Sequence, residues 1–205
     1  MKLTVIIPVY NQQELVIRAL ESIPQRDDIE IIVIDDCSTD NTWDKLIEYV
    51  LERPSLNIKV FHNEQNKGVG YTVNRGYDNA TGEYIVLLGS DDYFVEEFES
   101  ALNELDGTDM IYFNLKDNTG SIWKITPKNK NSYVGSVKFM RRAFIGDTRC
   151  PEIRVIEDAY FHKALMEKKP TEKYLDRVLK HYNFPREGSL TDILLKKGKV
   201  EWNIY

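Results

Sequence analysis

The sequence predicts an α/β protein with a mainly parallel sheet in its N-terminal half and a mixed C-terminal half. Continuous apolar segments recur at 3–10, 29–35, 58–62 and 83–88, with helical patterns between them. Such non-alternating segments are typical of parallel strands that are buried on both faces. Beyond residue 108 the pattern changes to short antiparallel strands. We therefore expect one domain over 1–205, formed by halves at 1–107 and 108–205.

The first two strands are each followed by a helix. After the strand at 3–10, Asn11 and Glu14 have the spacing of a capping box, which predicts a helix with an apolar face from Leu15 to Ile23. After the strand at 29–35, apolar residues recur at helical spacing from Trp43 to Leu51, and Pro54 ends that helix. Asp40 is the expected helix cap.

The next elements repeat this alternation. A strand at 58–62 precedes a helix over about 69–79, which we expect Gly82 to close, and a fourth strand covers 83–88. Residues 109–115 and 121–126 then predict an antiparallel pair joined at 117–120. The remaining elements are a polar loop at 127–131, helices at 135–145 and 157–169, and weak helical periodicity after Ser189.

Composition limits the class of protein. A chain of 205 residues buries roughly 70% of the surface that its unfolded form exposes. The formal net charge of −6 gives no overall case for a nucleic acid or an anionic membrane. Two cysteines without Cys/His spacing indicate neither disulfides nor zinc. Because no apolar segment approaches 18 residues, we expect a cytoplasmic protein without membrane insertion.

Acidic residues gather where the predicted parallel strands end. Asp35 and Asp36 follow one strand, and Asp91 and Asp92 follow another, after Gly89 and Ser90. Ligands of open parallel sheets bind at this edge. Adjacent carboxylates repel each other, so the second pair predicts a hard cation such as Mg²⁺ or Mn²⁺ shared with a diphosphate. The alternative for this pair is a helix cap, which needs only one carboxylate.

Several common sites are excluded by motif. The glycines of NKGVGYTVNRG lack dinucleotide-binding spacing after a first strand, and no P-loop occurs. No G-x-S-x-G is present, and His62, His162 and His181 have no neighbouring motif that would make them catalytic bases.

Four segments resemble, in order, the signatures of family 2 glycosyltransferases with the GT-A fold. They are VIIPVYN, VIDDCSTDNT, NKGVGYTVNRGYDNATGEYIVLLGSDD and IEDAYF. The resemblance is close over about 3–95 and thinner over 135–190. It implies transfer of a sugar from a nucleotide-diphosphate sugar, usually a UDP-sugar, to an acceptor, with a divalent metal on the diphosphate.

The resemblance also assigns roles to residues. It implies that Asp36 reaches the base, that Asp91 binds the metal with Asp92 as helper, and that Asp158 is the catalytic base beside Glu157. Glu157 and Asp158 are alternatively favourable acids at a helix start. Arg186 and Ser189 are expected near the phosphates, or in a plain solvated loop. The other expected donor contacts are Pro8, Tyr10, Asn11, Asp35, Asn66, Gly68, Asn74, Arg75 and Ser90.

The sequence departs from the family pattern twice. Gly89 replaces the first acid of the Asp-x-Asp element, and Cys37 replaces the commonest glycine of the DDGSTD form. Arg75 has an alternative role in a structural ion pair. One base without an opposing nucleophile favours direct displacement with inversion at the anomeric carbon.

Two other functions stay open: a nucleotidyltransferase-like enzyme, although no Gly-rich loop follows the first strand, and an inactive sugar-nucleotide-binding module. The acceptor is undetermined between a glycan, a lipid-linked glycan and a hydroxylated base in DNA. Basic residues occur at 128–130, 141–142 and 196–199. They indicate either an acceptor that carries phosphate groups or ordinary solvated surface. A homo-oligomer is compatible with the sequence.

Overall fold

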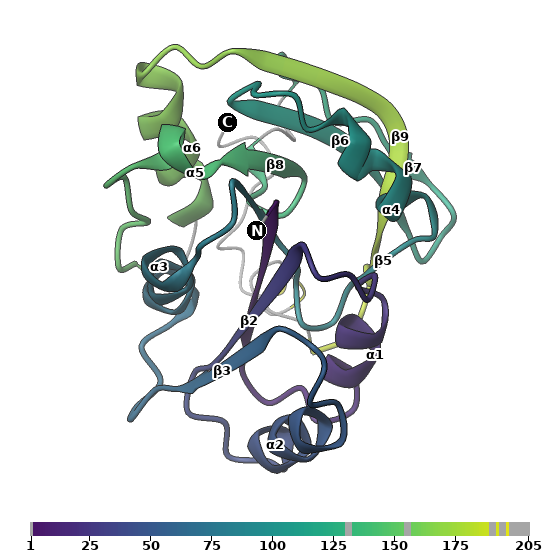
Figure 1. Ribbon diagram of the computed structural model, residues 1–205, viewed down its shortest axis with the longest axis vertical. Coiled ribbons are helices and arrows are strands. Elements are labelled where there is room, and N and C mark those ends of the chain that lie inside the picture. Colours follow the sequence, from purple (N-terminus) through teal and green to yellow (C-terminus); the bar gives the residue numbers. More distant parts are fainter. Residues whose placement is uncertain (1, 130–132, 154–156, 189–191, 193–195, 197–205) are drawn as a thin grey trace.

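The computed structural model describes residues 2–129, 133–153, 157–188, 192 and 196. Its centre is a nine-stranded sheet in the order β3-β2-β1-β4-β8-β6-β9-β5, with β7 paired to β6. Figure 1 shows the helices arranged around this curved sheet. The strands are β1 Leu3–Val9, β2 Ile29–Asp35, β3 Ile58–His62, β4 Tyr84–Leu87, β5 Tyr93–Phe94, β6 Met110–Asp117, β7 Ile122–Trp123, β8 Lys138–Arg141 and β9 Glu172–Tyr182. The helices are α1 Val16–Glu21, α2 Thr42–Glu52, α3 Val69–Asn79, α4 Glu97–Ala101, α5 Arg142–Ile145 and α6 Glu157–Glu167, with a 3-10 turn at Leu102–Glu104.

The predicted parallel unit is confirmed. β1 pairs in parallel with β2 and β4, and β2 pairs in parallel with β3. β1, β2 and β4 are almost entirely buried, as expected for apolar strands covered on both faces. β3 is the sheet edge and is partly exposed, so the expectation that it is buried on both faces is wrong. The parallel arrangement brings the ends of β1, β2, β3 and β4 to one edge of the sheet.

Helices cover the two faces of the parallel unit. α1 and α2 lie on one side and α3 on the other, next to α5 and α6 (Figure 1). The core accordingly has two clusters. One contains Val16 and Leu46 of α1 and α2, and the other contains Val73 and Tyr77 of α3 together with Phe161 of α6. No helix within the described ranges is long and apolar enough to cross a membrane.

Two predicted helix boundaries differ from the structure. α1 begins only at Val16, and no side chain caps it, so the capping box from Asn11 is wrong. Asn11 has a φ of 50° and bonds the segment after β2 instead. α3 ends at Asn79, and Gly82 lies beyond it. A Cβ at Gly82 would lie 2.6 Å from the amide nitrogen of Thr4, so this glycine permits close approach to β1 rather than closing a helix.

The predicted helix at 135–145 is largely wrong. Lys138–Arg141 form β8, which lies antiparallel between β4 and β6, and only Arg142–Ile145 are helical. Lys138, Phe139 and Met140 are buried in the centre of the sheet. Pairing on both sides therefore overrides the local helical periodicity.

The longest strand was not predicted. β9 pairs in parallel with β6 through an irregular register at Phe113–Leu115, and it pairs antiparallel with β5. In Figure 1 it curves over β6 and descends toward β5. The predicted β6–β7 hairpin and the α6 helix are confirmed. Most of the segment after Ser189, for which weak helical periodicity was noted, lies outside the described residues.

Candidate functional site

The edge formed by the ends of β1 and β2 is held together by a polar network. The Asn11 amide donates to Ser38 Oγ at 2.9 Å, and Asn11 Oδ1 accepts from the Thr39 amide at 2.8 Å. Asp40 accepts from the amides of Thr42 and Gln13, but the cap residue of α2 is Asn41, so the expectation that Asp40 is the helix cap is wrong. Tyr10 is 43% exposed beside this network. Its ring is therefore available to a ligand at this edge.

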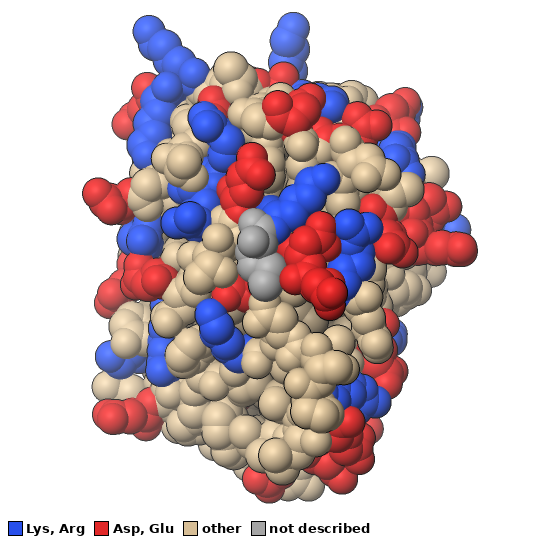
Figure 2. Space-filling view, viewed as in Figure 1, with Lys and Arg blue, Asp and Glu red and all other residues tan. Residues whose placement is uncertain are grey.

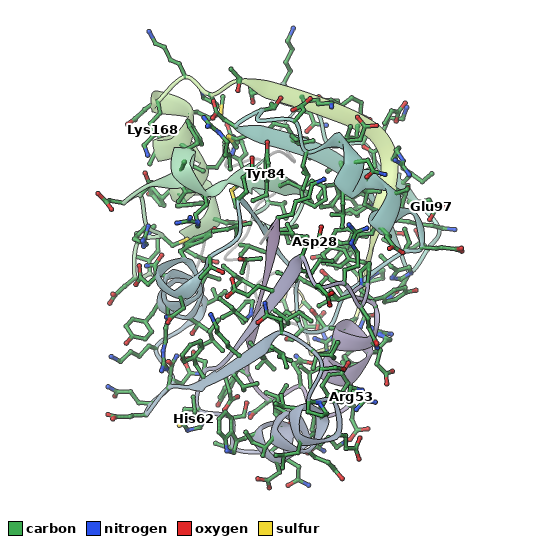
Figure 3. The ribbon with its side chains drawn as sticks, viewed as in Figure 1. Asp28, Arg53, His62, Tyr84, Glu97 and Lys168 are labelled. Carbon is green, nitrogen blue, oxygen red and sulfur yellow. The ribbon has the colours of Figure 1, made fainter. Side chains whose placement is uncertain are left out.

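Asp35 is fully buried at the end of β2. Its carboxylate accepts from the hydroxyl and amide of Ser38, and its Oδ2 lies 2.8 Å from His62 Nδ1. His62 ends β3, at the lower left of Figure 3. Asp35 therefore joins the loop after β2 to the end of β3, a role that uses both of its oxygens.

Asp36 organises the segment before α3. Oδ1 accepts from Asn63 Nδ2 at 2.8 Å and from the Lys67 amide at 3.0 Å, and Oδ2 accepts from the Gly68 amide at 2.8 Å. Gly68 has a φ of 89°, which a residue with a side chain rarely adopts. Cys37, next to Asp36, has a φ of 63°, so a backbone geometry that suits glycine is kept here with cysteine.

Three further residues expected to line the donor site, Asn66, Asn74 and Arg75, differ from one another in their contacts. Asn66 is exposed. Asn74 exchanges two hydrogen bonds of 2.8 Å with the backbone of Cys150 and so ties α3 to the segment before α6. Arg75 donates to the His62 carbonyl and to Asn63 Oδ1, both at 2.7 Å. These partners are uncharged, so among the described residues Arg75 holds the end of β3 without the ion pair that was its alternative role.

Asp91 meets two arginines in the loop after β4. Its Oδ2 accepts from Arg186 Nη2 at 2.8 Å, and its carbonyl accepts from Arg18 at 2.6 Å. Arg186 is thus brought from the chain beyond β9 to the predicted metal-binding loop, as the resemblance implied for a phosphate-binding residue. Ser189 lies outside the described residues.

Asp92 lies in a different environment from its neighbour. It is 3% exposed, and its Oδ2 accepts from Lys180 Nζ at 2.9 Å. Its Oδ1 accepts from the Asn183 amide at 2.9 Å, and Lys180 also donates to Ser136 Oγ at 2.6 Å. Burial raises the pKa of Asp92, against the opposing effect of Lys180. Both oxygens of Asp92 therefore bind protein donors, which does not fit the expected part in metal binding.

The residues present fit a divalent metal only through Asp91. Within the described part of the chain, no three His, Cys, Asp or Glu side chains are grouped to hold a metal by themselves. Asp91 uses Oδ2 for Arg186 and can offer Oδ1 to a cation. A site with one carboxylate suits Mg²⁺ or Mn²⁺ that takes its other ligands from phosphate and water.

Glu157 and Asp158 open α6 and line the same pocket as Gly89. Asp158 accepts from the Ala159 amide at 2.9 Å and from the Gly135 amide at 3.4 Å. Burial raises the pKa of Asp158, while buried Lys138 and these amides oppose the rise. Burial and the charge of Asp158 raise the pKa of Glu157 to about 7. Carboxyl groups with shifted pKa values in a cavity are typical of acid–base catalytic sites. The hydrogen bond from the Ala159 amide to Asp158 also fits the alternative, in which the acid only stabilises the start of a helix.

A cavity of about 180 Å³ joins these groups. Pro8, Gly89, Ser136, Glu157 and Asp158 are among the residues that line it. The rest of the lining is mainly apolar and comes from α3, β4 and α6. The ends of β1 and β4 and the start of α6 therefore converge on one pocket, as the motif positions predicted.

Three polar residues of this region were missed from the sequence: the half-buried Ser136 and the buried Lys138 and Lys180. Lys138 donates to the Val134 carbonyl at 2.9 Å, and burial lowers its pKa to about 7. The apolar residues of EKYLDRVLKHY recur in pairs four positions apart, which is helical rather than alternating spacing, so the sequence carries no clear signal for β9 or for Lys180 within it. No local signal indicates that either lysine is buried.

The basic clusters that could indicate a phosphate-bearing acceptor are partly paired with protein groups. Arg141 pairs with Asp109, and Arg142 donates to the Gly82 carbonyl at 2.8 Å. Lys196 pairs with Asp192 at 3.0 Å, and the cluster at 128–130 is only partly described. On the face shown in Figure 2, basic and acidic side chains are interspersed. The described members of these clusters therefore form no basic patch of the kind that a nucleic acid would need.

Comparison with curated proteins shows related glycosyltransferases. The chain is 32% identical over 223 residues to GalNAc(5)-diNAcBac-PP-undecaprenol beta-1,3-glucosyltransferase of Campylobacter jejuni, a match that covers 100% of this chain and 71% of that protein. It is 37% identical over 102 residues to poly(ribitol-phosphate) beta-N-acetylglucosaminyltransferase TarS of Staphylococcus aureus, which covers 47% of this chain and 17% of TarS. The chain thus corresponds to a fraction of the length of TarS.

Solved structures agree with the sequence comparison. S. aureus TarS 1-349 in complex with UDP-GlcNAc superimposes with a TM-score of 0.77 at 27% identity, over 92% of this chain and 60% of that one. This likeness confirms the predicted GT-A fold. The family model for Glycosyl transferase family 2 matches residues 4–175. The chain therefore belongs to glycosyl transferase family 2.

Proposed function

We propose that the protein transfers a sugar from a nucleotide-diphosphate sugar, of which a UDP-sugar is the first choice, to a hydroxyl group of an acceptor. The observation that carries this proposal is the pocket that is lined both by Gly89, which lies next to Asp91, and by Asp158. A diphosphate bound at Asp91 would place the anomeric carbon of its sugar toward Asp158. The related structure with UDP-GlcNAc supports a nucleotide-sugar donor.

Asp158 is proposed as the general base. It removes the proton of the acceptor hydroxyl while the acceptor oxygen bonds to the anomeric carbon. The bond from that carbon to the diphosphate breaks, and its electron pair leaves on the nucleoside diphosphate. The burial that raises the pKa of Asp158 brings the carboxyl closer to the operating pH, which favours proton transfer. Because the described lining of the pocket holds no carboxyl group besides the neighbouring Glu157 and Asp158, we propose direct displacement with inversion.

Asp91 is proposed to hold Mg²⁺ or Mn²⁺ together with the donor. Such an ion would stabilise negative charge on the leaving diphosphate. Arg186, already 2.8 Å from Asp91, is proposed to contact the same phosphates. Lys180 and Asn183 hold Asp92 and thereby position the loop that carries Asp91. Asp35 and Asp36 shape the nucleotide side of the site through the loops that they join.

Donor screening tests the proposal. UDP-, GDP- and TDP-sugars are tested with Mn²⁺ or Mg²⁺, and the melting temperature and the released nucleoside diphosphate are measured. Asp158→Asn, which keeps the shape and the acceptor for the Ala159 amide, should bind donor normally but transfer 10²- to 10⁴-fold more slowly. Transfer by the variant within about threefold of wild type, a barrier change under ~1 kcal/mol, would exclude Asp158 as the base.

A second candidate is a sugar-nucleotide-binding module without activity. Gly89 in place of the first acid, and the contact of Arg186 with Asp91, favour it. Donor-induced stabilisation without release of nucleoside diphosphate, tested with a range of acceptors, would select this candidate. The named relatives use a poly(ribitol-phosphate) and an undecaprenol-linked glycan, so the acceptor class of this chain stays open.

A further inference from the structure

The peptide unit between Val134 and Gly135 contacts the proposed base. Its N–H group, on Gly135, donates to Asp158 Oδ2 at 3.4 Å, and its carbonyl group, on Val134, accepts from Lys138 Nζ at 2.9 Å. A buried lysine and the proposed catalytic carboxylate therefore bind the two ends of one peptide unit. Because hydrogen bonds in a chain polarise one another, each of these contacts strengthens the other.

Neighbouring contacts hold this peptide unit in place. Ser136, the next residue, accepts from Lys180 Nζ at 2.6 Å, so a buried lysine binds the chain on each side of the Gly135 amide. Gly135 also permits a close approach, since a Cβ at this position would lie 3.2 Å from Leu87 Cδ1 and 3.6 Å from Asp158 Cβ. The N–H group is thus held against Asp158 by contacts from β8 and β9.

Lys138 lies where water does not screen its charge. Its side chain is 1% exposed in β8, and its Nζ lies 5.9 Å from the centre of the Tyr112 ring. Charges buried in this way interact more strongly than charges at the surface. Burial raises the pKa of Asp158, and among the described charged groups Lys138 opposes that rise most strongly. Burial likewise lowers the pKa of Lys138, and the charge of Asp158 opposes this change.

Other titratable groups lie near Asp158 on α6, on α3 and before α6: Glu157, His162, Tyr77 and Cys150. Burial lowers the pKa of His162 to about 3 and raises that of Cys150 to about 12. Burial also raises the pKa of Tyr77 well above its ordinary value, so these three groups are neutral near pH 7. Glu157 is an acid. Of these groups and Lys138, only Lys138 can carry a positive charge at neutral pH.

We infer that Lys138 is a positioning residue for Asp158: it fixes the peptide unit that donates to the carboxyl and supplies the opposite charge that keeps the carboxyl ionised. A general base must be ionised to accept the proton of the acceptor hydroxyl. In a mainly apolar pocket the carboxyl would otherwise tend to hold a proton and lose this ability. The inference deepens the proposed function, on which its meaning for catalysis rests.

NMR titration of protein labelled with ¹³C at the aspartate carboxyl carbons measures the pKa of Asp158 without any substrate, and Asp158→Asn identifies its resonance. Lys138→Gln keeps an N–H donor for the Val134 carbonyl but removes the charge. In this variant the pKa of Asp158 should rise by about one pH unit or more, because a nearby opposite charge typically lowers a carboxyl pKa by about 1 to 3. An unchanged pKa would overturn the inference.

Lys163→Gln is the matched control. Lys163 is exposed on the helix that carries Asp158, and solvent screens its charge, so this variant should leave the pKa of Asp158 unchanged. If Lys138→Gln does not fold, Glu157→Gln protein with ¹³C-labelled aspartate and lysine side chains decides the question, because the other acid of the pocket no longer titrates. The Asp158 resonance should move as Lys138 titrates, and a resonance that does not respond would contradict the inference.

The pH dependence of sugar transfer separates this inference from the proposed function. The acid limb of kcat/KM follows the pKa of the base in the free enzyme. In Lys138→Gln this limb should move to higher pH by the amount that NMR measures, so transfer is about tenfold slower at low pH and equal to wild type at high pH. A loss that is equal at every pH would overturn the inference. A raised pKa of Asp158 with an unmoved acid limb would keep the pairing of Lys138 with Asp158 and overturn Asp158 as the base.

Discussion

Replacing Lys180 by methionine should destabilise the protein strongly, because it leaves the carboxylate of Asp92 without its cation. The two side chains are 1% and 4% exposed, and 2.9 Å separates Lys180 Nζ from Asp92 Oδ2. Removing one partner of a buried ion pair typically costs about 3 to 5 kcal/mol. For a chain of this length that corresponds to a melting temperature lower by roughly 6 to 20 °C.

Lys173→Met is the matched control on the same strand. Lys173 also pairs with two acids, Glu104 and Asp106, but its side chain is 29% exposed. Exposed pairs contribute about 0 to 1 kcal/mol, so this variant should melt within a few degrees of wild type. Thermal unfolding of both variants is followed by circular dichroism.

A double variant separates the lost charge pairing from lost packing. Asp92→Asn keeps an acceptor for the Asn183 amide and removes the uncompensated charge. Added to Lys180→Met, it should recover part of the lost stability, since a neutral pair no longer needs a cation. A Lys180→Met variant that is no less stable than Lys173→Met would refute the reasoning. So would a double variant that loses the sum of both single losses.

Three other outcomes are expected. Glu157 has a pKa of about 7, above its ordinary 4.5. Its contribution to the free energy of unfolding is therefore complete below about pH 4.5 and is lost as the pH rises through 7. Glu157→Gln should flatten this decline in the free energy of unfolding, measured by chemical denaturation between pH 5 and 8. Asp91→Ala should abolish metal-dependent donor binding with the fold intact by circular dichroism, and metal-dependent affinity equal to wild type would remove Asp91 from the metal site. Uridine diphosphate should raise the melting temperature more than guanosine or adenosine diphosphate, whereas equal shifts would mean that the base is not read.

The parallel half was predictable because its information is local. β1, β2 and β4 are continuous apolar segments, and the acids that follow them mark the ends of the strands. The pairing order was not predictable in the second half. β8 is a strand because β4 and β6 flank it, although its sequence also fits a helix.

The candidate site, too, was predictable in one part and not in another. The sequence motifs indicated that Pro8 and Asp158 belong to one site, and both residues line the same pocket. They did not distinguish the surroundings of Asp91 and Asp92, which are adjacent in sequence. That difference depends on Lys180 and Asn183, which reach Asp92 from 88 and 91 positions away. Likewise, the hydroxyl of Tyr77, which has no hydrogen-bond partner among the described residues, is buried by packing between α3 and α6 and leaves no sequence signal.

The position of β9 also bears on the order in which the chain folds during synthesis. The parallel strands β1 to β4 are complete once residue 87 has emerged from the ribosome. β5, which directly follows the loop of Asp91 and Asp92, finds its partner only when residues 180–181 arrive. Contacts between distant segments form late because the intervening loop must close first. The parallel scaffold is therefore expected to form early in translation, and the loop of Asp91 and Asp92 to take its native shape only after residue 181 has emerged.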